Sequence, residues 1–219
     1  MLFRSGLTKG QYSPTSRVGT RSPSTPFGSV DQPASPCAFA LGSGARFVAR
    51  GIDVHKNLVG VLKAAHAHKG TSFVEIYQNC IVYNDDVFAP FAAKPNASEG
   101  QLWLEHGKPM LFAGGTKGIA LDRETLRLHA VDVVDNDWQT PGVLVHDERN
   151  KGLAQMLVDM GLQVGLPVAL GVIYQNPAAT FDSAVVRQNE EAATGKAPDL
   201  QKLISKGQTW QVEKEHHVV

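Results

Sequence analysis

Cysteine is scarce in this sequence, because the 219 residues contain only Cys37 and Cys80. Two cysteines are too few for the disulfide framework of a small secreted protein, so the composition favours a reducing compartment. The sequence also lacks an apolar run of about 18 residues or more, and Met1 to Ser5 is too short to be a secretory signal. We therefore expect a soluble, cytoplasmic protein with no membrane span.

Net charge is absent as well. The 21 Lys and Arg residues balance the 21 Asp and Glu residues, and no basic cluster interrupts the balance. Such a surface does not attract nucleic acid or an anionic membrane through its charge. We expect neither as a partner. The 42% of hydrophobic residues fits a folded protein with a substantial core.

The sequence offers no complete phosphate loop and no clear metal pair. The segment Gly114 to Gly118 reads G-G-T-K-G, but a Walker motif needs Ser or Thr after the lysine, where this chain has Gly118. We interpret the segment as a turn. His66 and His68 are two residues apart in an expected helix, so they point to different faces and make poor metal partners.

From Ser35 the chain alternates between helix and strand patterns. Ser35 followed by Pro36 is typical of a helix start, and Asp53 is expected to cap the next helix. The expected elements are a helix over 36–41, a strand over 46–50, a helix from Asp53 to Gly70 and a strand over 72–77. This alternation builds half of a doubly wound parallel sheet. Nothing before Gln11 is long enough to supply the other half.

Beyond Asn84 the pattern changes to a mixture of helices and strands. The expected elements are a short helix within 86–107, a hairpin turning at 122–124, a helix with the apolar stripe Leu153, Met156, Leu157 and Met160 capped by Asp147, a strand over 166–174, and helices over 181–193 and 200–204. We therefore predict two regions: a partial α/β domain over 1–83 and a smaller α+β region over 84–219. Residues 11–36, rich in Ser, Thr, Pro and Gly, are either a flexible linker or an ordered loop over a ligand.

Cys80 follows the expected strand over 72–77. The apolar character of that strand, with little alternation, is typical of a strand covered on both faces. Ligands gather at the carboxyl ends of strands in open α/β sheets, so the thiol could coordinate a metal or attack a substrate. The alternative is a small buried side chain, and position alone favours that structural role.

Lys9 lies in the segment Gly6 to Ser16, which reads G-L-T-K-G-Q-Y-S-P-T-S. The small neighbours of Lys9 would let its ammonium and nearby backbone amides approach an anionic ligand closely. The alternative is a solvated lysine in a loop. Periodicity does not choose between the two.

Several segments, in order, resemble the β subunit of 2-oxoacid:ferredoxin oxidoreductases, most closely the 2-oxoglutarate type. The two strongest are the Gly6 to Ser16 segment and V-E-I-Y-Q-N-C-I-V-Y-N-D-D-V-F over 74–88. K-P-M-L-F, K-G-I-A-L-D and H-D-E-R-N, later in the chain, also resemble that subunit. The resemblance covers nearly all of the chain after Ser5. It implies oxidative decarboxylation of a 2-oxoacid to an acyl-CoA, with the electrons passed to ferredoxin.

The resemblance also implies cofactors, partners and site residues. The family's β subunit binds thiamine diphosphate with Mg²⁺ and a [4Fe-4S] cluster, and it works with an α subunit. Gly6, Leu7 and Thr8 would line the thiamine diphosphate site, Lys9 would bind the substrate carboxylate, and Cys80 would be a cluster ligand. Residues 1–83 would then be the second half of a thiamine-diphosphate-binding, doubly wound parallel-sheet domain, followed by the small α+β carboxyl-terminal region.

The chain departs from the family pattern at its amino terminus. It lacks the C-x-x-C with a third cysteine, the G-D-G stretch and the Asn that precede the glycine in family members. A [4Fe-4S] cluster takes four cysteine ligands, and Cys37 does not match a ligand position. We therefore expect an amino-terminally truncated portion that is inactive alone. The alternatives are pyruvate or a branched-chain 2-oxoacid as substrate, or a non-catalytic α/β interaction module.

Overall fold

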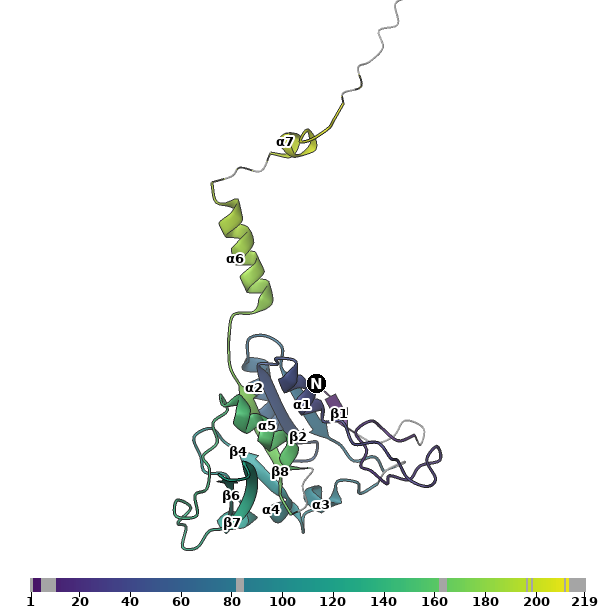
Figure 1. Ribbon diagram of the computed structural model, residues 1–219, viewed down its shortest axis with the longest axis vertical. Helices are drawn as coiled ribbons and strands as arrows, with labels where there is room; N and C mark the ends of the chain where they lie inside the picture. The colour runs from purple at the N-terminus through teal and green to yellow at the C-terminus, as the bar shows by residue number, and fades with distance from the viewer. Residues whose placement is uncertain are drawn as a thin grey trace, which may run out of the picture. The chain divides into compact units, whose positions relative to one another are not determined.

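The computed structural model describes residues 2–4, 11–81, 85–161, 165–195, 197, 199–210 and 212 (Figure 1). The chain forms two compact units, Met1–Ala178 and Ala179–Val219. Among the described residues, no helix combines the length and the apolar character that crossing a membrane requires.

A five-stranded mixed sheet forms the centre of the first unit. Its strand order is β1-β3-β2-β8-β4. The strands are β1 (Leu2–Arg4), β2 (Phe47–Ile52), β3 (Phe73–Tyr77), β4 (Gln101–Leu104) and β8 (Val168–Gln175). The predicted parallel arrangement is confirmed for β2 and β3. The strand β1 was not predicted and runs parallel to β3, whereas β8 runs antiparallel to β2 and parallel to β4.

Helices cover both faces of this sheet, as the apolar strands predict. The helices are α1 (Pro36–Gly42), α2 (Leu58–Ala67) and α5 (Lys151–Met160). Alternate residues of a strand point to opposite faces. Val48 of β2 accordingly packs in the core that contains α1 and α5, while Phe47 and Ala49 pack in the core that contains α2. The residues on the α1 and α5 face therefore include Arg50, two positions after Val48.

A second, three-stranded antiparallel sheet follows β4. It comprises β5 (Leu111–Phe112), β6 (Lys117–Asp122) and β7 (Arg127–Asp132), and three short helical segments, α3 (Ala89–Ala92), α4 (Ala97–Gly100) and η2 (Ala113–Gly115), lie in the same part of the chain. The predicted hairpin is confirmed, because β6 pairs with β7 and the Asp122 carboxylate accepts from the backbone N–H groups of Glu124 and Thr125. The turn expected at 114–118 forms η2, where Gly114 and Gly115 have positive φ, and leads into β6.

The predicted cap of α1 is confirmed, but those of α2 and α5 are wrong. The Ser35 side chain accepts from the N–H of Ala38 at the start of α1. The Asp53 carboxylate instead accepts from the adjacent N–H of Val54, and turns delay the start of α2 until after Asn57. Asn150, not Asp147, caps α5 by accepting from the N–H of Leu153.

Residues 11–36 form a loop closed by its own hydrogen bonds. The backbone N–H of Gly19 donates to the carbonyl of Ser29 at 2.7 Å, and that of Ala34 donates to the carbonyl of Pro14 at 2.8 Å. Ser29 is buried. These contacts favour an ordered loop over a flexible linker. A ligand beneath the loop stays a prediction.

The second unit contains α6 (Phe181–Ala193) and α7 (Leu200–Ile204), which confirms both predicted helices. Thr180 and Asp199 cap them, and no residue of either helix is buried. In the first unit, the five-stranded sheet draws strands from both sides of residue 83. The division into regions 1–83 and 84–219 stays a prediction.

Candidate functional site

The carboxyl ends of β2 and β3 lie side by side at one edge of the sheet. Ile52 pairs with Tyr77 there because the two strands run parallel. Asp53 follows directly after β2, and Asn79 follows two residues after β3. Loops at this edge of an α/β sheet are where ligands bind, so this edge is a candidate ligand site.

A cavity of about 240 Å³ opens at this edge. It is lined by Ile52, Asp53, Val54, Tyr77, Asn79, Asp86, Phe88, Ala89, Ala92 and Ala93. The Tyr77 and Phe88 rings lie against each other with centroids 4.9 Å apart. A mostly apolar wall with a few polar side chains is the usual character of a small-molecule site.

Cys80 lies just beyond β3, as predicted, and is partly buried with a free thiol. Its neighbour Asn79 donates to the Asp85 carboxylate at 2.7 Å. Within the described ranges, no group of three or more His, Cys, Asp or Glu side chains could hold a metal ion. The described residues therefore do not fit a cluster held by this chain alone. Cys80 as one ligand of a shared cluster stays a prediction.

Cys37 has a structural environment. It is fully buried in α1, and its Sγ–H donates to Oε2 of Glu75 at 3.3 Å. Burial raises the pKa of the Cys37 thiol to about 12. Since metals and electrophiles take the thiolate, this cysteine is unsuited to ligation, in agreement with the sequence analysis.

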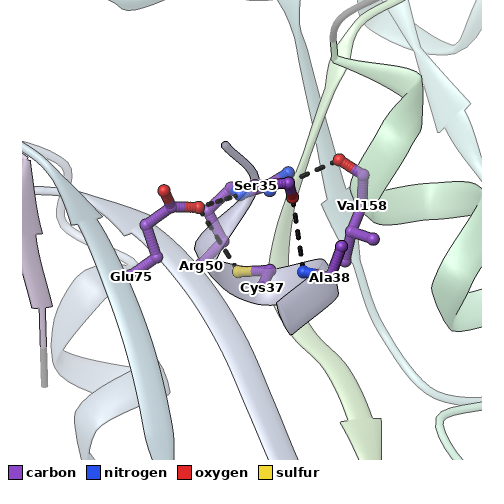
Figure 2. A network of polar contacts seen from close by, with 6 residues as sticks. All are labelled: Ser35, Cys37, Ala38, Arg50, Glu75 and Val158. Carbon is purple, nitrogen blue, oxygen red and sulfur yellow. Dashed lines mark hydrogen bonds and ion pairs between the residues drawn. The ribbon is translucent and has the colours of Figure 1, made fainter. Parts of the chain in front are cut away.

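Glu75 also pairs with Arg50 in a polar network between the sheet and the helices α1 and α5 (Figure 2). The Arg50 Nε donates to Oε2 of Glu75 at 2.8 Å, and both side chains are buried. The Arg50 Nη2 donates to the carbonyl of Val158 at 3.4 Å, and the guanidinium carbon lies 5.6 Å from the Tyr77 ring centroid. Burial alone would lower the pKa of Arg50, but Tyr77, Cys37 and Glu75 raise it on balance, so the guanidinium is charged.

Sequence reasoning missed Arg50 and Glu75, because a strand pattern does not show the register between two strands. The available signal was one charged residue in each of two neighbouring strands, positive in β2 and negative in β3. Arg50 and Glu75 are register partners in the parallel pair, so the sheet brings them together.

The predicted residues Gly6, Leu7, Thr8 and Lys9 lie outside the described residues. The chain is described up to Arg4, which pairs with Tyr77 at the end of β3, and again from Gln11. The cofactor and substrate roles of these four residues stay predictions.

No protein-family model matches the chain, but individual proteins do. The chain is 36% identical over 215 residues to 2-oxoglutarate oxidoreductase subunit KorB of Mycobacterium tuberculosis, covering 95% of this chain and 56% of that protein. It is 29% identical over 204 residues to the 2-oxoacid:ferredoxin oxidoreductase subunit beta of Sulfolobus sp, covering 92% and 55%. The chain thus spans about half the length of the curated relatives it matches.

A solved structure shares the fold. The 2-oxoglutarate:ferredoxin oxidoreductase from Magnetococcus marinus, with 2-oxoglutarate, coenzyme A and succinyl-CoA bound, aligns with a TM-score of 0.59 and 21% identity, over 91% of this chain and 53% of that one. At that identity the likeness concerns the fold alone. The sequence relatives confirm the resemblance inferred from the motifs: this chain is homologous to about half of the β subunit of 2-oxoacid:ferredoxin oxidoreductases, including 2-oxoglutarate-type members.

Proposed function

We propose that this chain is a portion of the β subunit of a 2-oxoglutarate:ferredoxin oxidoreductase, which converts the 2-oxoacid to an acyl-CoA and passes electrons to ferredoxin. The observation that carries the proposal is the 36% identity to a KorB subunit over 215 residues. The shared fold with a 2-oxoglutarate:ferredoxin oxidoreductase supports it. Because the chain spans about half of its relatives, the activity is proposed for the whole assembly with its α subunit.

Lys9 is our proposed ligand of the substrate carboxylate. A charge-assisted hydrogen bond of this kind contributes about 1.5–3 kcal/mol. Gly6, Leu7 and Thr8 would line the thiamine diphosphate site. Mg²⁺ would bind there together with the cofactor. When bound, thiamine diphosphate supplies the electron sink for decarboxylation. The pairing of Arg4 with Tyr77 supports this placement, because the chain leaves β1 at the edge where α/β proteins bind ligands.

Cys80 is our proposed contribution to a [4Fe-4S] cluster. Its place after β3, partly buried and with a free thiol, supports the role. The sequence has two cysteines, one of them the buried Cys37, so the remaining ligands would come from polypeptide outside this sequence. We propose a cytoplasmic location, as expected for an enzyme that uses ferredoxin and coenzyme A.

The test is an anaerobic assay of the assembled α and β subunits. We expect coenzyme A-dependent reduction of ferredoxin with 2-oxoglutarate, and a lower kcat/KM with pyruvate or branched-chain 2-oxoacids. A preference for pyruvate would replace the proposed substrate while keeping the reaction. Failure with every 2-oxoacid, in a preparation that contains thiamine diphosphate and iron, would reject the function. The relatives do not favour the alternative of a non-catalytic module.

A further inference from the structure

One face of α2 is exposed to solvent, while the opposite face packs in the core shared with β2, β3 and β8. The exposed residues recur at helical spacing and are Val59, Gly60, Lys63, His66 and Ala67. Val59 is 59% exposed, and a Cβ atom built on Gly60 would have open space around it. The centre of this face is therefore small, apolar and open to an approaching surface.

Three lysines place positive charge on and around this centre. Lys56 precedes the helix, Lys63 lies on its exposed face and Lys69 follows it, and all three are exposed. None of them forms a salt bridge within the part of the chain that the structure describes. The stretch 54–74 contains no carboxylate. We call the exposed side of α2 with these three lysines the basic face.

The carboxylates nearest to the basic face in the sequence are directed elsewhere. Asp53 lines the cavity at the carboxyl ends of β2 and β3, as does Asp86. Glu75 is buried in its pair with Arg50. The balanced net charge concealed the basic face, because its lysines are spread along the sequence and the compensating carboxylates lie in other parts of the chain.

The amino-terminal end of α2 adjoins the edge that carries Cys80. The helix follows β2 after a short connection, and Ile52 at the end of β2 pairs with Tyr77 at the end of β3. Cys80 follows Tyr77 closely in the chain. A protein bound to the basic face would therefore lie beside the proposed cluster ligand.

We propose that the basic face of α2 docks an acidic electron-carrier protein of the ferredoxin type. The inference rests on the proposed oxidoreductase function, which supplies electrons to such a carrier. Four thiolate ligands give an iron–sulfur carrier a negatively charged cluster, and opposite charges speed the encounter of two proteins and fix their orientation. Electron-transfer complexes have small interfaces. The ten residues of α2, about 15 Å long, offer a contact of that size.

The test is calorimetric titration of the purified full chain with a [4Fe-4S] ferredoxin. Lys63→Glu reverses the charge at the centre of the basic face, and circular dichroism checks that the chain stays folded. We expect the Kd to rise about tenfold or more, the effect of losing one close charge pair. The wild-type Kd should also rise between about 0.03 M and about 0.3 M salt, because salt screens exposed charges.

Lys151→Glu is the matched control for this charge reversal. Lys151 is an exposed lysine of α5, on the other face of the sheet from α2, so its reversal should leave the Kd unchanged. Gly60→Gln tests the shape of the basic face without altering its charge. The helix accommodates glutamine well at an open position, and the added side chain should weaken ferredoxin binding by keeping the two surfaces apart.

Weaker binding by Lys63→Glu or Gly60→Gln, with Lys151→Glu unchanged, supports the basic face as the docking surface. The proposal is overturned if the wild-type chain does not bind ferredoxin, if both α2 variants bind as tightly as the wild type, or if Lys151→Glu weakens binding equally. The titration needs no turnover, so it is separate from the enzymatic test. An assembly that reduces ferredoxin while both α2 variants bind normally would keep the function and reject the docking surface.

Discussion

Arg50 and Glu75 show how two charges can be kept inside this protein. Each is buried, and each would be strongly unfavourable without the other. Because β2 and β3 run parallel in register, the sheet makes the two residues direct partners, and their ordered side chains bring Nε of Arg50 to 2.8 Å from Oε2 of Glu75. Its contribution to stability is therefore best measured by removing one partner.

Glu75→Gln should lower the free energy of unfolding by about 3–5 kcal/mol, since it leaves a buried guanidinium without its counter-ion. Urea denaturation measures the change. Glu99→Gln is the matched control: Glu99 pairs with Lys117 at 2.9 Å, but both side chains are well exposed, so the loss should stay below about 1 kcal/mol. Equal losses in the two variants would contradict the role assigned to the buried pair.

His146 predicts a pH dependence of stability. It is buried, its Nε2 lies 2.9 Å from the carbonyl of Val172, and its Nδ1 has no partner within the described part of the chain. Nε2 therefore carries the proton, and burial lowers the pKa of His146 below its usual value. As pH falls, the unfolded chain takes up this proton first. The stabilisation that the fold gains from keeping His146 neutral is complete above the unfolded pKa of about 6.5. It is lost as pH falls below that value.

The free energy of unfolding should therefore decline as pH falls from about 7.5 through the unfolded pKa of about 6.5, and His146→Gln should flatten that decline. His129→Gln, at an exposed position of β7, should leave the wild-type slope unchanged. Denaturant unfolding across this pH range measures both. A wild-type slope that persists in His146→Gln would assign the dependence to another group.

At the scale of single elements, sequence patterns located helices well and their starts less well. Asp53 and Asn57, and likewise Asp147 and Asn150, are pairs of short polar residues near a helix start; of the four, Asn150 makes a side-chain cap hydrogen bond, whereas Asn57 makes none. In each pair the first residue closes a local turn with the next backbone N–H groups instead. Pattern alone does not separate these two uses of one side chain, because both satisfy the same kind of donor.

Asn150→Ala should lower the free energy of unfolding by about 1 kcal/mol, because it removes the acceptor for the N–H of Leu153 at the start of α5. Asp147→Ala, three residues earlier and outside the helix, should cost less than about 0.5 kcal/mol. Thermal unfolding of the two variants side by side measures the difference. The reverse order of the two losses would restore Asp147 as the cap.

For the whole molecule, the sequence predicted the α/β alternation and the place of Cys80 after β3. It could not predict that β8 would join β2, because that pairing links residues more than a hundred positions apart and is antiparallel. The Arg50–Glu75 pair was missed for the same reason, since it depends on the register between strands. The cofactor residues 6–9 came from the family resemblance, and their roles stay predictions.

Cys80→Ala, introduced into the assembled enzyme, should reduce its iron content and the visible absorbance of the cluster, because a proposed thiolate ligand is lost. Cys37→Ala is the matched control: this thiol is buried and held protonated, so the iron content should stay at the wild-type level. Iron analysis of the two purified variants decides the assignment. Full iron occupancy in Cys80→Ala would remove Cys80 from the ligand set.

Lys9→Ala in the same assembly should raise the KM for 2-oxoglutarate about tenfold or more, and more than the KM for pyruvate, if Lys9 binds a carboxylate of the longer substrate. Lys151→Ala, an exposed lysine on α5, should change neither value. Steady-state kinetics with both substrates test this. An equal rise for the two substrates would leave Lys9 without a part in substrate choice.

The position of β8 also bears on how the protein is made. This strand lies between β2 and β4, yet it is among the last segments of the first unit to leave the ribosome. Until Val168–Gln175 has emerged, the nascent chain presents β2 as an open edge, with hydrogen-bonding groups exposed to other unfinished chains. Co-translational folding of the sheet must therefore wait for its late central strand, and a chaperone that shields β2 would act in that interval.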